Sequence, residues 1–587
     1  MSRRDLIDVA MGKAPADQII DGGVLVNVLT AELYPAGIAI KGNRIAAVGD
    51  VSYTRGPQTK VTQADGRYLV PGLVDGHLHS YHSYLGVNEF VQGLLTHGVT
   101  ATADGFYGQG IVGGIDAVRF VKEAFERMPI RLIFLVPTLA YLQNRELGLT
   151  PVKGISVEDM FEMLDWPGCY GLEEPPSLPI IEKDEAFLRL FEETLARRKV
   201  VTGHASGLNE RQVQAYVAMG AYTEHESFEH HDALMKARAG LKILARLGSG
   251  CVDLPELMRA HTELRADPRA FAFCVDVASP EKLIGQGALD ENVRAAIANG
   301  VNPVTAIQMA SINVAEIFYA QQDVGTIAPG RFADILLVDD LARFSIDRVL
   351  VGGQVVVKEG RFVAQLPATT YPTDFYQTVV LASPVTADDL TLKVDTADGE
   401  ADVRVIGVTE GNLLTTERRA RVKIDQGRIV PNVEGDVLPI AMVDRFGKGT
   451  GIGLGLVQGF GLHRGAMATS VNAVCENLVV VGTNAHDMAV AVNHLAKIGG
   501  GKVIVEDGRI LALIELPLLG LLSEDPMNVV SEKFDRAFRV LADLGCQLKS
   551  PFSQLEFCCA CGEMGAIKIS DEGLLLTDPP RKVGVLV

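Results

Sequence analysis

The chain is 587 residues long, which exceeds what one hydrophobic core usually organises and predicts two to four domains. Its hydrophobic share of 48% and charged share of 22% are typical of a globular protein. The net charge of -19 argues against a general nucleic-acid binder, because phosphate binding requires a basic surface.

The apolar runs in this sequence fall short of the roughly 18 residues that a membrane-spanning helix needs. The first residues, MSRRDLIDVAMGKAPADQII, lack the apolar core of a secretory signal peptide. We therefore expect a cytoplasmic protein that has no membrane partner.

Residues 18–70 contain the short β-type runs VLVNVL, GIAIKGNRIAAVG and RYLVPG, which predict a small antiparallel sheet. A matching set, GTIAPGRFADILLVDD and RVLVGGQVVVKEGRFV, appears much later in the chain. We expect both sets to build one composite β-sandwich domain from residues 1–70 and 325–370, with the rest inserted between them.

The inserted residues, 71–324, alternate strand and helix. Helical runs such as 184–199 and 210–220 separate most of the strand candidates, which are LVPGLVDGH, VTATADG, RLIFLVPT, CYGLEE, VVTGHA, AYTEHE, LKILAR and AFAFCVD. Eight such strands predict an α/β fold, a TIM-like (β/α)8 barrel with its site at the C-terminal strand ends. A doubly wound open sheet is the alternative, and the strand count favours the barrel.

Residues 371–587 predict a separate C-terminal α+β domain. Two helices, 486–499 and 531–545, are expected among β segments. The glycines of GTGIGLG do not indicate a dinucleotide-binding loop, because no clear strand precedes them and no clear helix follows.

Three histidines, His77, His79 and His82, fall within six positions of a chain that has only 12. If residues 69–79 form a strand, His77 and His79 project to the same side of its C-terminal end. Neutral imidazoles are good ligands for zinc, manganese or iron. The spacing therefore predicts a metal half-site, and His82 is expected in the following loop.

Further candidate ligands stand where later predicted strands end. They are Glu173 or Glu174 after the fourth strand, His204 after the fifth, His225 after the sixth, and Asp276 after the eighth. A barrel brings the ends of such strands together in space. A set of this kind suits two divalent ions bridged by a carboxylate.

The order of these motifs resembles that of the amidohydrolase superfamily and, more closely, of the adenine deaminase family. PGLVDGHLH, GLEE, TGHASGL and TEHES resemble the barrel motifs of that family, and VQGFGLHRGAMATSV and VVVGTNAHDMAVAVNHL resemble its additional C-terminal domain. The resemblance covers nearly the whole chain. It implies two divalent metal ions, Mn²⁺ or Fe²⁺ with Zn²⁺ as an alternative, and hydrolysis of adenine to hypoxanthine and ammonia.

Carried over by position, the resemblance implies the metal ligands His77, His79, Glu174, His204, His225 and Asp276. Glu174 is preferred to Glu173 as the bridge because the family pattern places this glutamate three residues after the glycine. Asp276 is also expected to act as general acid and base. Glu226 is the second catalytic candidate, either polarising the substrate or orienting an imidazole.

The sequence departs from the family pattern around the expected pocket. Ser80-Tyr81 replaces an Ile-Glu pair, and Asp104-Gly105-Phe106-Tyr107 replaces Asp-Pro-His-Glu. In the C-terminal domain, Glu476 ends the stretch that corresponds to His-Asp-Ser-His. These changes predict an altered substrate pocket, whose candidate contacts are Tyr81, His82, Phe106, Tyr107 and Glu476.

Three functions remain open from the sequence. The first is hydroxide attack on C6 of adenine or a related aminopurine, with release of ammonia. The second is a cyclic amidohydrolase that opens a lactam, ureide or oxidised purine ring, and it is favoured by Tyr81, because tyrosine is a poor acid. The third, an inactive binding relative, is disfavoured by the six retained ligands. Each enzymatic reading implies a small heterocyclic substrate, and we expect a homo-oligomer, a dimer or larger.

Overall fold

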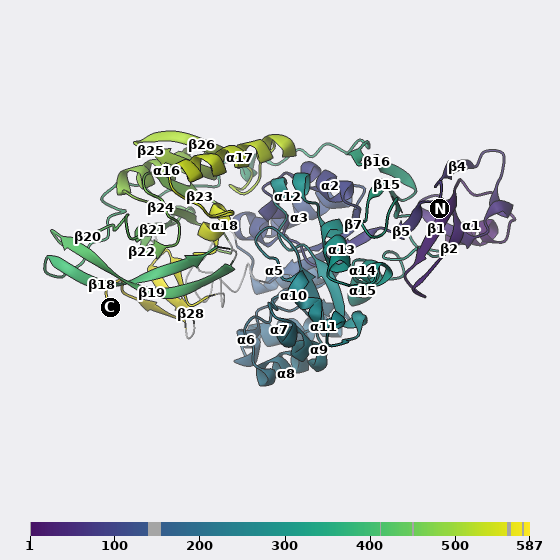
Figure 1. Cartoon of the computed structure of the whole chain (residues 1–587), viewed down its shortest axis with the longest axis horizontal. Helices are drawn as coiled ribbons and strands as arrows, with labels where there is room; N and C mark the ends of the chain where they lie inside the picture. The colour runs from purple at the N-terminus through teal and green to yellow at the C-terminus, as the bar shows by residue number, and fades with distance from the viewer. Residues whose placement is uncertain are drawn as a thin grey trace.

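The computed structural model describes residues 2–138, 154–410, 412–448, 451–472, 474–559, 565–577 and 580–587. Three parts lie side by side along the molecule: a sheet near the N-terminus, a barrel in the middle, and the C-terminal sheets and helices at the other end (Figure 1). Within the described ranges, no helix is both long enough and apolar enough to cross a bilayer.

Strands from before and after the barrel share one nine-stranded sheet at the N-terminal end of the molecule, next to helix α1 (Arg3–Ala10). Its strands are β1 (Gln18–Asn27), β2 (Glu32–Lys41), β3 (Arg44–Gly49), β4 (Lys60–Gln63), β5 (Tyr68–Pro71), β14 (Ile335–Val338), β15 (Ile346–Val351), β16 (Gln354–Lys358) and β17 (Arg361–Phe362). The sheet is mixed rather than antiparallel as predicted, because β1 pairs in parallel with β4 and β5. Instead of two facing sheets, this single sheet buries a separate apolar cluster on each face.

Eight parallel strands form the barrel, at the eight segments that the sequence predicts. They are β6 (Leu73–Asp75), β7 (Val99–Asp104), β8 (Arg131–Pro137), β9 (Cys169–Glu173), β10 (Val200–Val201), β11 (Thr223–Glu224), β12 (Lys242–Arg246) and β13 (Phe271–Cys274). Ladders join β6 to β10 in one arc and β11 to β13 in another. Hydrogen bonds close both seams: the Tyr222 N–H donates to the Val201 carbonyl at 3.0 Å, and the Gly76 N–H donates to the Phe273 carbonyl at 3.3 Å.

Helices lie around and between the barrel strands (Figure 1). The helices of this part are α2 (Val87–Thr96), α3 (Tyr107–Glu126), α5 (Val157–Leu164), α6 (Ser177–Ile181), α7 (Glu185–Ala196), α8 (Glu210–Met219), α9 (His230–Ala239), α10 (Leu254–Leu257), α11 (Arg259–Thr262), α12 (Pro280–Gly285), α13 (Leu289–Ala298), α14 (Pro303–Met309) and α15 (Ile312–Ile317). The two that the sequence predicts most clearly, α7 and α8, begin after Asp184 and Asn209. These side chains accept hydrogen bonds from the first free N–H groups of each helix, which fixes where it starts.

The stretch predicted as one strand over residues 69–79 is divided at Gly72. Residues before it belong to β5 of the small sheet, and residues after it belong to β6 of the barrel. A Cβ at Gly72 would lie 2.1 Å from the Thr100 hydroxyl oxygen, so only glycine fits where the chain passes from one sheet to the other. The chain therefore passes from the small sheet into the barrel at Gly72, where the backbone lies close to the side chain of Thr100.

The described residues of the C-terminal part form a nine-stranded sheet, a three-stranded sheet and three α-helices. The larger sheet consists of β18 (Gly399–Thr409), β19 (Asn412–Asp425), β20 (Arg428–Val430), β21 (Leu438–Val443), β22 (Ile452–Gln458), β23 (Ala466–Thr469), β24 (Leu478–Gly482), β25 (Gly501–Glu506) and β26 (Arg509–Glu515). The smaller one consists of β27 (Ile567–Ser570), β28 (Gly573–Thr577) and β29 (Pro580–Val583). Helices α16 (Ala485–Ile498) and α17 (Met527–Asp543) match the two predicted helices, and α18 (Pro551–Glu556) follows them.

The C-terminal part contacts the loop that follows the first barrel strand. The Ser523 N–H donates to the Tyr84 carbonyl at 2.8 Å, and the Gly86 N–H donates to the Ser523 carbonyl at 2.9 Å. The Tyr84 hydroxyl donates to Oε2 of Glu556 at 3.2 Å. The loop that begins at the predicted metal ligands is thus fixed by residues distant in sequence.

A buried ion pair between Lys502 and Glu556 lies beneath this contact. Their side chains are 0% and 1% exposed, and the Lys502 ammonium lies 4.1 Å from the centre of the Tyr84 ring. Burial lowers the pKa of Lys502 and raises that of Glu556, so each charge depends on the other for compensation. Removing only one partner would leave an uncompensated charge in the interior.

We therefore expect Lys502→Met to lower the free energy of unfolding by about 3–5 kcal/mol. The double variant Lys502→Met with Glu556→Gln should recover most of that loss, because neither remaining group is charged. Denaturant unfolding of the two variants and the wild type measures the difference. Equal destabilisation by both would show that lost packing, rather than unpaired charge, causes the effect.

Candidate metal centre

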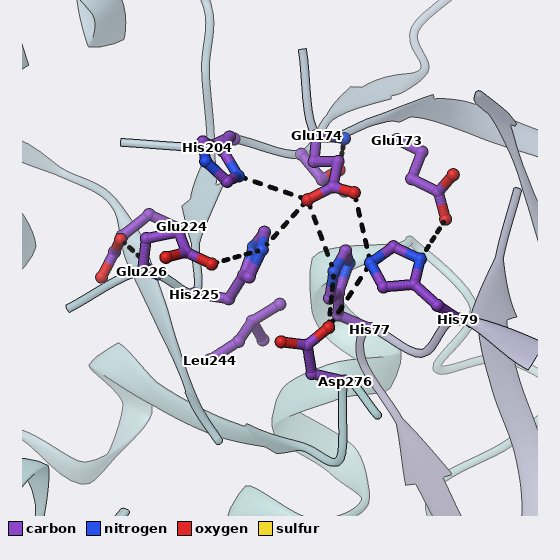
Figure 2. Close-up of polar contacts among 12 residues, drawn as sticks. His77, His79, Glu173, Glu174, His204, Glu224, His225, Glu226, Leu244 and Asp276 are labelled. Atoms are coloured by element: carbon purple, nitrogen blue, oxygen red, sulfur yellow. Dashed lines mark hydrogen bonds and ion pairs between the residues drawn. The ribbon is translucent and has the colours of Figure 1, made fainter. Parts of the chain in front are cut away.

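His77 and His79 lie just beyond the end of β6, in extended chain that runs beside the end of β13. The Asp276 N–H donates to the His77 carbonyl at 2.9 Å, and the His79 N–H donates to the Asp276 carbonyl at 2.9 Å. These bonds hold the two histidines on either side of Leu78, so both side chains point into the barrel mouth beside Asp276 (Figure 2). The predicted half-site therefore forms beyond the strand itself.

Glu174, the residue after β9, lies at the centre of the histidines (Figure 2). Its Oε2 is 3.1 Å from Nε2 of His225 and 3.3 Å from Nδ1 of His204, while its Oε1 is 3.2 Å from Nε2 of His79. Two groups of potential metal ligands result, and Glu174 belongs to both. The groups are His77–His79–Glu174 and Glu174–His204–His225, each with its ligand atoms within 4.8 Å of one another.

The chemistry of these donors fits two divalent cations. His77 Nε2 and Glu174 Oε1 are buried, and neither has a hydrogen-bond partner among the described residues. Burial alone would raise the pKa of Glu174, but the surrounding histidines hold it well below its usual value, so the group is an anion. Burial lowers the pKa of His79, yet Glu174 and Glu173 raise it to about 10, which shows how strongly this site favours positive charge. Imidazole with carboxylate is a donor set suited to zinc, manganese or iron.

Glu173 points away from the point where the two groups meet. Its Oε1 accepts a hydrogen bond from the Gly105 N–H at 2.8 Å and lies 3.8 Å from Nδ1 of His79. It therefore touches the far nitrogen of one histidine, as a residue that orients a ligand does. This geometry favours Glu174 over Glu173 as a bridging carboxylate.

Asp276 lies opposite Glu174, and its two oxygens have different neighbours. Oδ1 is 3.4 Å from Nε2 of His79 and 3.7 Å from Nε2 of His77. Oδ2 is 3.2 Å from Nη1 of Arg246, the last residue of β12. The sequence reasoning did not single out Arg246, although a cation that directly follows the apolar run Ile243–Ala245 was a usable signal.

Glu226 follows His225 and is buried with it. Its Oε1 lies 3.4 Å from Nε2 of His225 and also forms an ion pair with Arg246. Burial raises the pKa of Glu226, but Arg246, His204 and His225 bring it down to about 2. Glu226 is therefore an anion at neutral pH, suited to accepting hydrogen bonds.

The backbone at two of these carboxylates is unusual. Glu174 has a φ of 33° and Asp276 a φ of 65°, in the left-handed region that residues other than glycine seldom adopt. Such conformations cost on the order of 1–3 kcal/mol and persist where the surrounding structure imposes them. They allow each carboxylate to turn back from its strand end towards the histidines.

Of the predicted substrate contacts, Tyr81, Tyr107 and His82 lie near the candidate ligand His79. The Tyr107 ring centre is 4.6 Å from that of His79, and the Tyr81 hydroxyl donates to the Tyr107 hydroxyl at 2.8 Å. Burial raises the pKa of both tyrosines well above 10, so both stay neutral. His82 is buried in a short 3-10 turn, with its ring 4.0 Å from that of Tyr81.

Phe106 does not lie with them. Its ring is fully buried, 5.2 Å from the ring of Phe125 and 6.2 Å from that of Phe134. The residue has a φ of 60°, which turns its side chain into the core rather than the barrel mouth. The Phe106 ring therefore packs in the core of the structure and not at the barrel mouth, where stacking on a substrate was expected.

Glu476 comes from the C-terminal part and is fully buried. Its Oε2 accepts a hydrogen bond from the Asn472 N–H at 3.3 Å, and within the described residues its Oε1 has no hydrogen-bond partner. The carbonyl of Asn472 lies 3.5 Å from the Tyr81 hydroxyl, so this segment covers the tyrosine pair. Burial raises the pKa of Glu476 well above its usual value despite nearby Arg445, and a protonated carboxyl can donate a hydrogen bond.

The chain is similar to known proteins over nearly its whole length. Residues 68–356 match the amidohydrolase family, and residues 412–578 match the adenine deaminase C-terminal domain. The chain is 39% identical over 553 residues to the adenine deaminase of Moorella thermoacetica, covering 94% of this chain and 92% of that protein. It is 36% identical over 579 residues to adenine deaminase 3 of Rhizobium meliloti, covering 97% and 96%. A solved structure of a Xanthomonas campestris adenosine deaminase with bound zinc aligns with a TM-score of 0.45 at 15% identity, over 60% of this chain and 95% of that one.

Proposed function

The chain belongs to the adenine deaminase family of the amidohydrolases, and from this membership we propose that it hydrolyses adenine, or a closely related aminopurine, with release of ammonia. It is then a hydrolase of carbon–nitrogen bonds other than peptide bonds. The observation that carries the proposal is the pair of ligand groups that share Glu174 at the barrel mouth. Similarity to the relatives over nearly the full chain supports the same substrate class.

His77, His79, His204, His225, Glu174 and Asp276 would hold two divalent ions in this proposal. Such ions activate water at neutral pH and polarise the substrate. We assign Mn²⁺ or Fe²⁺ because the family resemblance implies them, with Zn²⁺ as the alternative, since mixed imidazole and carboxylate donors suit all three. Metal analysis of the purified protein distinguishes them.

The remaining residues would orient the purine and move protons. Asp276 Oδ1 lies beside the histidine ligands, where it can accept a proton from the attacking water and return it to the leaving nitrogen. Glu226 can accept a hydrogen bond from the exocyclic amino group. The neutral hydroxyl of Tyr107, which accepts the hydrogen bond of Tyr81, and the carboxyl of Glu476 can donate to ring nitrogens.

We expect manganese-loaded protein to consume adenine and to release one ammonia for each adenine lost. Adenine absorbance and an enzymatic ammonia assay, followed in the same sample, measure the two rates. The same protein after treatment with a chelator is the control and should be inactive. No adenine turnover by protein with two bound metals, together with ring opening of cyclic amides without ammonia, would replace adenine by a cyclic amide as substrate.

The proposal also covers the cellular location and the oligomeric state of the enzyme. We assign it to the cytoplasm and expect a homo-oligomer, a dimer or larger, as the family resemblance implies. Light scattering of the purified protein measures its mass against the 63.0 kDa of one chain.

A further inference from the structure

Arg246 is a buried cation at the rim of the metal site. Its side chain is only 2% exposed, and its guanidinium contacts three carboxylates. Nη1 pairs with Glu226 and lies 3.2 Å from Oδ2 of Asp276, while Nε donates to Oδ2 of Asp253 at 2.9 Å. The contacts join the ends of three barrel strands, β11, β12 and β13, because the carboxylates of Glu226 and Asp276 follow β11 and β13.

Asp253 and Phe228 hold the outer side of the guanidinium, away from Glu226 and Asp276. Nη2 is also 2.9 Å from Oδ2 of Asp253, and the guanidinium carbon lies 5.5 Å from the centre of the Phe228 ring. A planar guanidinium fixed at one edge presents its other edge in a defined direction. Asp253 therefore sets the position from which Arg246 reaches the two carboxylates in the site.

One oxygen of each site carboxylate is occupied by this contact, and the other is left for chemistry. With Oδ2 bound to Arg246, Asp276 presents Oδ1 to His77 and His79. With Oε1 bound to Arg246, Glu226 keeps Oε2 buried and without a hydrogen-bond partner among the described residues. A freely rotating carboxylate would present either oxygen to either neighbour.

We propose that Arg246 is a positioning residue that fixes the rotation of Asp276 and Glu226 together. In the deaminase reaction, on which this inference rests, it directs Asp276 Oδ1 to the attacking water and Glu226 Oε2 to the amino group of the substrate. Arg246 acts through these residues and does not itself touch the reacting atoms.

The test uses the full-length, metal-loaded enzyme and the variants Arg246→Ala and Arg246→Gln, the second being closer in size if the first fails to fold. Each should lower kcat by about 100-fold or more while both metals remain bound. Guanidine hydrochloride at millimolar concentration should restore part of the activity of Arg246→Ala, because it can occupy the same position. Arg246→Lys should stay impaired, since a compact ammonium cannot replace a planar fork that reaches two carboxylates.

Asp253→Asn is the matched control. Its amide oxygen can still accept a hydrogen bond from Nε of Arg246 and so keep the guanidinium in position, so kcat should fall only a few-fold and guanidine should not rescue it. Wild-type kcat in Arg246→Gln, or no recovery of activity by guanidine in Arg246→Ala, would overturn the positioning role.

A readout without substrate separates this inference from the proposed function. Cobalt-loaded wild type and Arg246→Ala should differ in their visible absorption, because Asp276 contributes to the ligand field, and guanidine should restore the wild-type spectrum. An unchanged spectrum would overturn the positioning role. If wild type fails to turn over adenine while the cobalt spectra behave as expected, the substrate assignment fails and the role of Arg246 stands.

Discussion

Glu174→Gln is expected to lower kcat/KM for adenine by about 1,000-fold or more and to reduce bound metal to one ion per chain or fewer. Glu174 is the residue common to both ligand groups, so its loss affects both. A glutamine keeps the shape but has no negative charge to offset two divalent ions. Losing several kcal/mol of electrostatic stabilisation costs a factor of ten for every ~1.4 kcal/mol.

Glu173→Gln provides the control, because the two glutamates are adjacent and both are buried. Its carboxylate accepts the Gly105 N–H and approaches the far nitrogen of His79, and an amide oxygen can keep the first of these contacts. We expect two metals to remain and activity to fall by roughly 10–100-fold, as for a partner that orients a ligand. Metal content and kcat/KM are measured in both variants. A larger loss of both in Glu173→Gln than in Glu174→Gln would identify Glu173 as the bridging residue.

The clustering of the candidate ligands could be predicted because a parallel barrel places strand ends together. His204, His225 and Asp276 follow three different strands, β10, β11 and β13, whose segments the sequence predicts. The predicted strands, together with the family resemblance, therefore indicated which residues to expect at the barrel mouth. The sharing of Glu174 between two groups followed from its central position, which only the folded barrel defines.

Other features depend on contacts that no local pattern contains. Gly72 separates two sheets because Thr100, distant in sequence, leaves room for no side chain. The positive φ of Asp276 is imposed by hydrogen bonds to the chain at His77 and His79. Phe106 and Tyr107 look alike in sequence, but the Phe106 ring packs 5.2 Å from that of Phe125, whereas the Tyr107 ring lies 4.6 Å from that of His79.

The C-terminal part contacts residues beside the candidate site, through contacts that the sequence alone does not specify. Glu476 was predicted to contact substrate because it replaces a histidine-rich stretch of the family. The structure brings the neighbouring Asn472 carbonyl to the Tyr81 hydroxyl, and Ser523 pairs with the chain at Tyr84. This part therefore covers the loop that follows β6.

Asp276→Asn is expected to lower kcat for adenine by about 100- to 10,000-fold while most of the metal stays bound. The amide oxygen can still face His77 and His79, but the group can no longer accept a proton and return it to the leaving nitrogen. Asp334→Asn is the matched control: Asp334 is a buried aspartate paired with Arg131, at the opposite end of the barrel strands. The control should retain nearly wild-type kcat, whatever it does to stability.

The leaving group distinguishes proton transfer from metal binding as the cause of the loss at Asp276. A 6-chloropurine releases chloride, which needs no proton, whereas adenine releases ammonia, which does. If Asp276 delivers that proton, Asp276→Asn should be impaired much less with the chloropurine than with adenine. If Asp276 serves mainly to hold metal, both substrates should suffer equally and bound metal should fall with them. Rates with the two purines are each normalised to metal content. Their comparison separates proton transfer from metal binding at Asp276, whose Oδ1 faces His79 and whose Oδ2 faces Arg246.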